Sequence, residues 1–213
     1  MKFIIHRIIL LIYLLLGQIV LGGEKVQISL NGISLFNDAY GHNLDLRFTY
    51  QIHTNVSVYL RGQHYYGNNE YYQVLNGNGF AIGGRLFEPD AKGNGFFGDL
   101  QVGTFKLDFK TSGTINKWNN LPSVYKDYTF EKNVTYLDIA GGYQYYFFKH
   151  CFLEFSLETG LRYRNVDIIE LSEAEEKEFV PVLREVLVHR LAVKPGKGLV
   201  PWLTYNFRLG VKF

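Results

Sequence analysis

The segment PWLTYNFRLGVKF, residues Pro201–Phe213, alternates between apolar and polar side chains and finishes on phenylalanine. Because successive side chains of a β-strand point to opposite faces, this pattern predicts a strand with one apolar and one polar face. What the apolar face contacts has to be inferred from the remainder of the chain. The residues of the apolar face are Leu203, Tyr205, Phe207, Leu209, Val211 and Phe213.

The same alternation recurs along the chain and predicts a single domain built from strands. The clearest case is LDLRFTYQI, residues 44–52, in which apolar residues alternate with Asp45, Arg47 and Thr49. No helical crossover long enough to join parallel strands separates these segments, so we expect antiparallel pairs. The eight predicted strands are residues 26–36, 44–52, 56–62, 80–87, 96–110, 135–148, 151–163 and 201–213.

The strand at 96–110 changes the parity of its apolar positions part-way along. Leu100 and Val102 occupy even positions, whereas Phe105, Leu107 and Phe109 occupy odd ones. One extra residue near Gly103 would restore a single apolar face. The sequence therefore predicts a β-bulge at this point.

The lengths of the predicted connections favour an up-and-down barrel in a membrane. Short turns alternate with long loops, of which residues 111–133 form a long polar example. Outer-membrane barrels have short periplasmic turns and longer outer loops. A soluble sandwich or a lipocalin-like barrel would show the same alternation with its apolar face inside. The aromatic residues near strand ends suit a membrane–water boundary, namely Phe96, Phe97, Tyr143, Tyr145, Tyr146, Phe147 and Phe148.

The amino-acid composition also fits a membrane barrel better than a bundle of membrane helices. Aromatic residues make up 16% of the 213 residues, and there are 22 glycines. The mean hydropathy is −0.06, which is too polar for a bundle of membrane helices but normal for a barrel whose strands alternate. The single cysteine, Cys151, excludes a disulfide within the chain.

Residues 1–23 predict a cleaved secretory signal peptide, with a basic start, an apolar run and small residues near its end. An uncleaved membrane anchor is the alternative. The segment holds Lys2 and Arg7 and no acidic residue, so the mature chain has 22 − 2 = 20 basic and 20 acidic residues. This balance predicts no nucleic-acid partner.

A different pattern covers residues 171–191 and predicts a helical insert in the last outer loop. Ser172 and Glu175 match a capping box, and Pro181 is expected to kink or split the helix. The apolar residues at helical spacing are Phe179, Leu183, Val186, Leu187 and Leu191.

Three segments, YNFRLGVKF, GGYQYYFFKHCFLEFSLETGLRY and GGRLFEPDAKGNGFF, resemble the small bacterial outer-membrane β-barrel domain family, which includes OmpX- and OmpW-like proteins. The resemblance implies an eight-stranded antiparallel transmembrane barrel in the outer membrane. It also implies that the barrel assembly machinery recognises the last strand during biogenesis, through Tyr205, Phe207, Leu209, Val211 and Phe213. The predicted insert at 171–191 departs from the simplest members.

The sequence predicts no catalytic, cofactor-binding or metal-binding residue. Some small outer-membrane barrels modify lipid A with a His–Ser pair two residues apart, and neither His42, His53 nor His64 has such a serine. No His/Cys/Asp cluster has the spacing of metal ligands. A catalytic triad formed by residues from different strands is an alternative that the sequence alone does not exclude.

The polar faces of the strands carry charges that are predicted to face the barrel interior. Eight strands leave an interior just wide enough to be filled by side chains, so ion pairs are the first interpretation and a solute path the second. These residues are Asp45, Arg47, Arg61, Arg85, Glu154, Glu158, Arg162 and Arg208.

The sequence therefore predicts a non-enzymatic barrel with a structural or surface-interaction role through its outer loops. A narrow pore or carrier for small solutes is the second hypothesis, and a lipid A-modifying enzyme is the third. The expected partners are outer-membrane lipid, the assembly machinery, and an extracellular ligand or protein.

Overall fold

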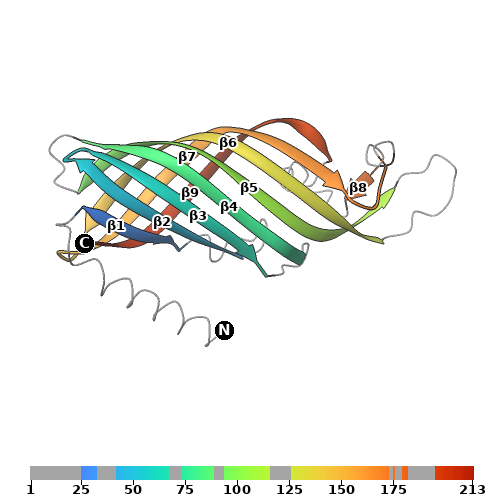
Figure 1. Cartoon of the computed structure of the whole chain (residues 1–213), viewed down its shortest axis with the longest axis horizontal. Helices are drawn as coiled ribbons and strands as arrows, with labels where there is room; N and C mark the ends of the chain where they lie inside the picture. Colours follow the sequence, from blue (N-terminus) through green and yellow to red (C-terminus); the bar gives the residue numbers. More distant parts are fainter. Residues whose placement is uncertain are drawn as a thin grey trace.

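The computed structural model describes residues 25–32, 42–67, 73–88, 94–115, 126–172, 175, 179–181 and 195–213. Nine strands run through these ranges, and eight of them close a ring in which each strand is antiparallel to both neighbours (Figure 1). The strands are β1 (Val26–Asn31), β2 (His42–His53), β3 (Val56–Tyr66), β4 (Gln73–Phe87), β5 (Gly95–Ile115), β6 (Lys126–Tyr146), β7 (Cys151–Ile168), β8 (Phe179–Pro181) and β9 (Gly196–Lys212).

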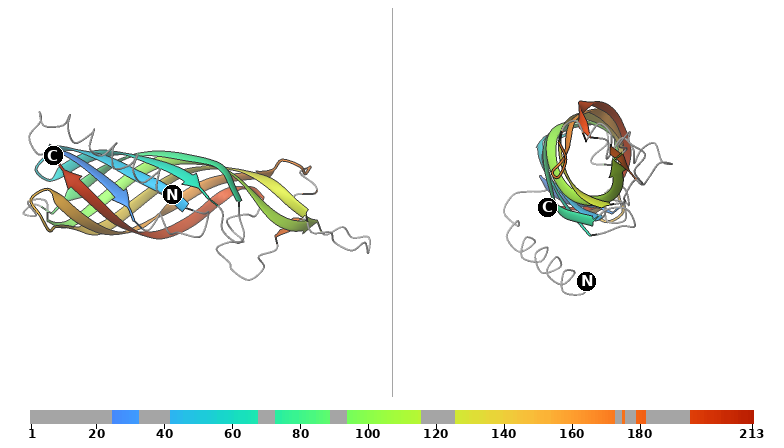
Figure 2. Two further views of the ribbon diagram at one scale, coloured as in Figure 1. Left: turned by 90° about the horizontal axis from the view of Figure 1, so that it is seen from below. Right: turned by 90° about the vertical axis from the view of Figure 1, so that its right-hand side faces the viewer.

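The ring is closed by the pairing of the first strand with the last, and the end-on view in Figure 2 shows this closure. Val26 N donates to Phe213 O at 3.2 Å, and Phe213 N donates to Val26 O at 2.7 Å. The predicted eight-stranded antiparallel barrel is confirmed. The predicted signal peptide, residues 1–23, lies outside the described residues.

The register of the ring fixes the tilt of the strands. Ile28 of β1 pairs with Phe48 of β2, which has its own partner on β3. When these pairs are followed from strand to strand through β7, they end at Pro201 on β9. Ile28 itself pairs with Val211, ten residues further along β9. A shear of ten in an eight-stranded ring, with the usual spacings within and between strands, corresponds to a tilt of about 40°. An interior of this size is filled by side chains.

The wall of the barrel has two sections of opposite polarity. On β5, Leu100 and Val102 point outward and are about half exposed, while Asp99 and Gln101 point inward and are buried. Beyond Gly103 the arrangement is reversed, with buried Phe105 and Leu107 inside and Lys106 and Asp108 outside. We call the first section the lower barrel. The second section, centred on residues 104–115 of β5 and 126–135 of β6, is the outer extension.

The reversal explains why the predicted β-bulge near Gly103 is wrong. The pairing of β5 with β4 runs without a shift from Asp108 to Phe97, and its pairing with β6 is continuous throughout. The change in parity of the apolar residues therefore reflects a change of surroundings, not an extra residue. Below Gly103 the apolar side chains face outward, and above it they face the interior.

The same reversal lengthens the strands beyond the sequence prediction. Residues 111–133 were expected to form a loop, yet β5 continues to Ile115 and β6 begins at Lys126. Likewise, β3 reaches Tyr66 and β4 begins at Gln73. In the outer extension the outward face is polar, and this makes a strand resemble a loop in sequence. Figure 1 shows β5 and β6 projecting well past β1 and β2.

Inside the outer extension, apolar side chains form a cluster that fills the barrel. It draws residues from β3 to β8, and the rings of Phe109 and Phe130 stack with centroids 5.1 Å apart. Phe179 contacts this cluster from above, with its centroid 5.4 Å from those of Tyr128 and Phe130. The members are Tyr65, Ala81, Phe105, Leu107, Phe109, Tyr128, Phe130, Val134, Tyr136, Val166, Ile168 and Phe179.

Phe179 belongs to β8, which corrects part of the predicted helical insert. Residues Phe179–Pro181 pair with Ile115–Gly113 of β5, so the helix prediction is wrong for these three residues. The apolar cluster buries Phe179, and backbone pairing replaces a helical turn that Pro181 would break. The predicted capping contact is present, because Ser172 N and Oγ both donate to Glu175 Oε2. Most of the remaining insert lies outside the described residues.

Glycine and aromatic residues are matched across the strands of the interior. Each of four inward glycines lies directly opposite a ring that a Cβ atom would strike. The pairs are Gly83 with Tyr59, Gly103 with Tyr136, Gly142 with Phe97, and Gly210 with Phe152. Rings laid over glycines in this way pin the register of neighbouring strands.

Replacing Gly83 with valine is expected to lower the free energy of unfolding by about 1–3 kcal/mol, because the side chain would overlap the Tyr59 ring. Urea titration of the protein in detergent micelles measures this change. The matched control is Gly84→Val on the same strand, where an added Cβ meets only Ser57 O at 3.9 Å. Equal losses for the two variants would show that the ring does not occupy the space above Gly83.

Candidate functional site

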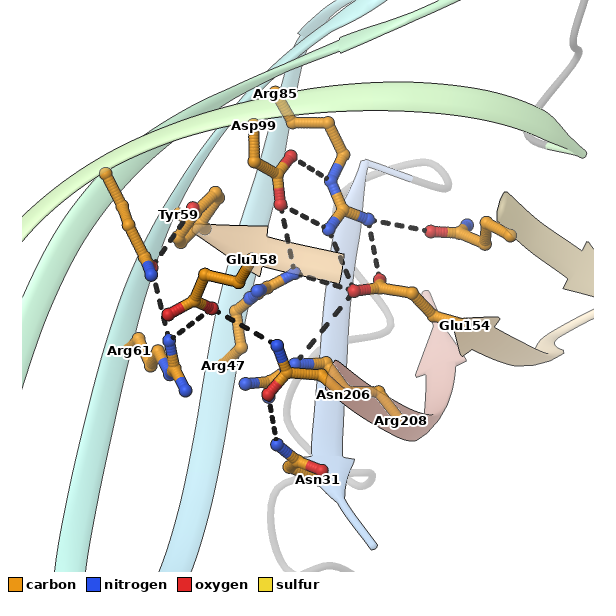
Figure 3. A network of polar contacts seen from close by, with 12 residues as sticks. Asn31, Arg47, Tyr59, Arg61, Arg85, Asp99, Glu154, Glu158, Asn206 and Arg208 are labelled. Atoms are coloured by element: carbon orange, nitrogen blue, oxygen red, sulfur yellow. Dashed lines mark hydrogen bonds and ion pairs between the residues drawn. The ribbon is translucent and has the colours of Figure 1, made fainter. Parts of the chain in front are cut away.

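The lower barrel is crossed by a network of ion pairs, which is the main concentration of charge in the described residues (Figure 3). All eight predicted interior residues point inward. Seven are at most 5% exposed, and the side chain of Arg162 is 15% exposed. Asp45 and Arg47 come from β2, Arg61 from β3, Arg85 from β4, Glu154, Glu158 and Arg162 from β7, and Arg208 from β9.

Arg85 is the centre of the part nearest the short turns. Its guanidinium donates to both carboxylate oxygens of Asp99, at 2.7 and 2.8 Å, and to both of Glu154, at 2.7 and 3.0 Å. The Phe97 ring lies under the guanidinium, with its centroid 3.7 Å from the guanidinium carbon of Arg85. Arg47 shares the Glu154 carboxylate, with Nη1 3.0 Å from Oε1. Bidentate pairing of this kind fixes geometry as well as charge.

A second group surrounds Asp45, the next carboxylate toward the outer extension. Arg61 and Arg208 both donate to Asp45 Oδ2, at 2.8 and 2.7 Å. Arg61 also donates to Glu158 Oε2 at 3.2 Å, so one arginine links strands β2, β3 and β7. The network thereby joins strands that are not neighbours in the ring.

Arg162 marks the upper edge of the network, where it meets the apolar cluster. Its Nη2 lies 3.3 Å from Asp138 Oδ2 and 3.6 Å from Glu158 Oε1. The guanidinium carbon lies 4.1 Å from the centre of the Trp202 ring and 5.2 Å from that of Tyr136. Aromatic faces therefore complete the surroundings of this arginine as the interior changes from polar to apolar.

Several members of the network are not among the predicted interior residues. Asp99 and Asp138 supply two of the five carboxylates that pair with five arginines in the described residues. Both alternate with outward apolar residues, Asp99 before Leu100 and Asp138 between Leu137 and Ile139, so the same pattern could have identified them. The amides Asn31, Gln101, Gln144 and Asn206 also take part.

The five aromatic and aliphatic residues of the predicted assembly signal lie on the outward side of β9 and at its end. Tyr205 and Leu209 are more than half exposed, and Phe207 contacts Phe155 with ring centroids 4.7 Å apart. Val211 and Phe213 lie beside the first strand. This face is continuous with the outward apolar face of β7.

The histidines do not assemble a catalytic site within the described residues. His53, His64 and His150 are exposed, and their ring nitrogens contact Thr54, Asn78 and the Lys212 carbonyl respectively. The described part of the chain contains no group of three or more His, Cys, Asp or Glu side chains suited to a metal ion. Within those ranges, no helix has the length and apolar character needed to cross a membrane.

The outward face of the outer extension is polar and carries paired charges. Lys106 Nζ lies 2.9 Å from Glu131 Oε1, and this hydrogen bond lowers the pKa of Glu131. Ser112 donates to Asp127, and Asn133 donates to Glu131. The loops expected to bind partners, around residues 68–72 and 116–125, lie outside the described residues.

No protein-family model and no curated protein matches this sequence. One solved structure is similar, the N-terminal β-barrel domain of OprF from Pseudomonas aeruginosa. The likeness covers 89% of this chain and 98% of that one, at 12% identity and a TM-score of 0.41.

Proposed function

We propose that this chain is a sealed, non-enzymatic barrel of the bacterial outer membrane, with a structural or surface-interaction role through its outer end. The observation that carries the proposal is the reversal of polarity along continuous strands. A wall that is apolar outside and ionic inside suits lipid, and a wall that is polar outside and apolar inside suits water. The two sections therefore fit a barrel that crosses a membrane and projects beyond it.

The height of the outward apolar face supports this placement. On β7 the outward residues from Leu153 to Tyr163 are apolar apart from Thr159. At a rise of about 3.3 Å per residue and a tilt of about 40°, this stretch, which lies on the taller side of the wall, is about 25 Å tall, as in known membrane barrels. Phe155 and Leu157 of this stretch are more than half exposed, as is Ile139 on the neighbouring strand β6. A soluble barrel of the lipocalin kind would bury such a face inside.

The interior favours a sealed barrel over the narrow-pore hypothesis. Ion pairs fill the lower barrel, and the apolar cluster fills the outer extension above them. An ion would have to cross both layers, and the second consists mainly of aromatic and aliphatic side chains. The lipid-modifying hypothesis has no supporting geometry in the described residues, because the exposed histidines contact neither a serine nor a carboxylate.

The proposal includes export by the signal peptide at residues 1–23 and recognition of the last strand by the barrel assembly machinery. Kinship with the OmpX- and OmpW-like proteins is also part of it, and rests on the three segments that resemble that family. An extracellular ligand or protein remains the expected partner of the outer end.

The first test compares the mobility of membrane-extracted protein in SDS gels before and after boiling. A closed barrel resists cold SDS, so we expect a mobility shift that appears only on heating. Cell fractionation should place the protein with the outer membrane. Recovery in the soluble periplasmic fraction, without a heat-dependent shift, would instead indicate a soluble β-fold.

Planar-bilayer recording separates the sealed barrel from the pore. We expect no regular conductance steps from the purified protein, because two filled layers block the interior. Regular single-channel steps would overturn the sealed state and favour the pore. A mass shift of lipid A on expression of the protein would favour the enzyme.

A further inference from the structure

The upper limit of the outward apolar face follows one plane on five neighbouring strands. Because the strands are tilted, two paired residues do not lie at the same height along the barrel axis. With a shear of ten over eight strands, the residue at the same height is displaced from the paired residue by about 1.25 residues on each successive strand. Relative to β5, the limits on β2, β3, β4 and β6 all lie within roughly one residue of that plane. The last outward residues below the limit are Leu44, Gly62, Phe80, Val102 and Leu137.

On β7 and β9 the apolar face continues above this plane. Leu161 and Tyr163 of β7 are 56% and 50% exposed, and Leu199 of β9 is 68% exposed. Leu161 pairs directly with Pro201, which is also exposed, and Tyr163 pairs with Leu199. These four residues form a block that reaches roughly 4–12 Å above the plane, given the rise and tilt of the strands. We call it the raised apolar patch.

The raised apolar patch is capped by a cation. The next outward pair above Tyr163 and Leu199 is Asn165 with Lys197, and Lys197 is exposed. Asn165 donates to Asp167 Oδ2 at 2.7 Å, so the nearest outward carboxylate on β7 already has a partner. A lysine at the top of an apolar surface can hold its ammonium group at the level of lipid phosphates.

We propose that outer-leaflet lipid rises against β7 and β9, with acyl chains on the raised apolar patch and an anionic headgroup at Lys197. This inference rests on the proposed membrane location. Continuity favours lipid over a protein partner, because the outward residues of β9 are apolar without interruption from Leu199 to Val211. A bilayer accommodates a wall that is taller on one side by thickening locally.

Spin-label accessibility in phosphatidylglycerol-containing liposomes tests this contact, on a Cys151→Ser background that removes the native thiol. Single cysteines replace Leu199 in the patch, Leu157 in the lower barrel, and Asn133 on β6. Asn133 is a matched control, because it points outward at about the same height as Leu199 but lies on a polar surface. We expect labels at 199 and 157 to favour collisions with oxygen, and the label at 133 to favour a water-soluble nickel complex.

Each other outcome has a distinct meaning. Preference for nickel at 199 would overturn the lipid contact, and protection from both reagents would indicate a covering protein. Spin–spin broadening at 199 would indicate a second copy of the chain. Preference for nickel at 157 as well would overturn the membrane location itself. With Lys197→Glu, we expect the oxygen preference at 199 to fall to its value in phosphatidylcholine liposomes, and no change would overturn the headgroup assignment.

Discussion

Replacing Glu154 with alanine is expected to lower the free energy of unfolding by about 3–5 kcal/mol, because it leaves buried arginines without a counter-ion. Glu154 is 1% exposed and accepts from both Arg85 and Arg47. Arg85 keeps Asp99 as a partner, whereas the closest carboxylate oxygen left to Arg47 is 3.5 Å away. Urea titration in detergent micelles or liposomes measures the loss.

Two further variants separate charge from packing in this prediction. Ser156→Ala removes only the hydroxyl of an inward, buried and uncharged side chain two residues along β7, and should cost far less. The double variant Glu154→Met with Arg47→Met should recover part of the loss, because it removes an opposite pair instead of one member. A double variant as unstable as the sum of the two single ones would contradict the ion-pair account.

Replacing Leu157 with arginine is expected to lower the free energy of unfolding by about 2–4 kcal/mol, since it puts a charge on the outward face that we propose contacts the hydrocarbon. Leu157 is 55% exposed, so the loss cannot come from crowding in the interior. The control is Asn133→Arg, on the polar outward face of the outer extension, which should fold nearly as well as the unchanged protein. The measurement is the folded fraction in liposomes, scored by the unheated gel band.

Similar stability of both arginine variants would contradict the lipid-facing assignment of the lower barrel. It would not affect the ring of strands, which depends on backbone pairing. Glu154 and Leu157 therefore report on the inside and the outside of the same strand, β7.

Much of the lower barrel could be predicted from the sequence, because one rule held along each strand. Alternation at Leu44–Ile52 placed Asp45 and Arg47 on the inward face, where the structure has them. Strand pairing follows from the same pattern once the short turns are recognised. The ring and its order were therefore accessible without the structure.

The outer extension could not be predicted in the same way, because its rule is the reverse. The predicted bulge puts Phe105 and Leu107 on the outward face, although both are inward and buried. The change in parity near Gly103 marks the point where the outward face becomes polar, but a β-bulge would give the same pattern in the sequence. The individual ion pairs were also inaccessible, since Arg61 and Glu158 lie 97 residues apart and meet only through the closure of the ring.

The outer extension also bears on how the barrel enters the membrane. In the proposed membrane location, the outward charges of this section, among them Lys106, Asp108 and Glu131, must pass the hydrocarbon before they reach the far side. A charged residue at the centre of a bilayer costs about 2.5–3.5 kcal/mol on insertion scales. Spontaneous insertion into liposomes should therefore face a higher kinetic barrier than for a barrel with short loops. The finished protein, in turn, should be held against expulsion by the same charges.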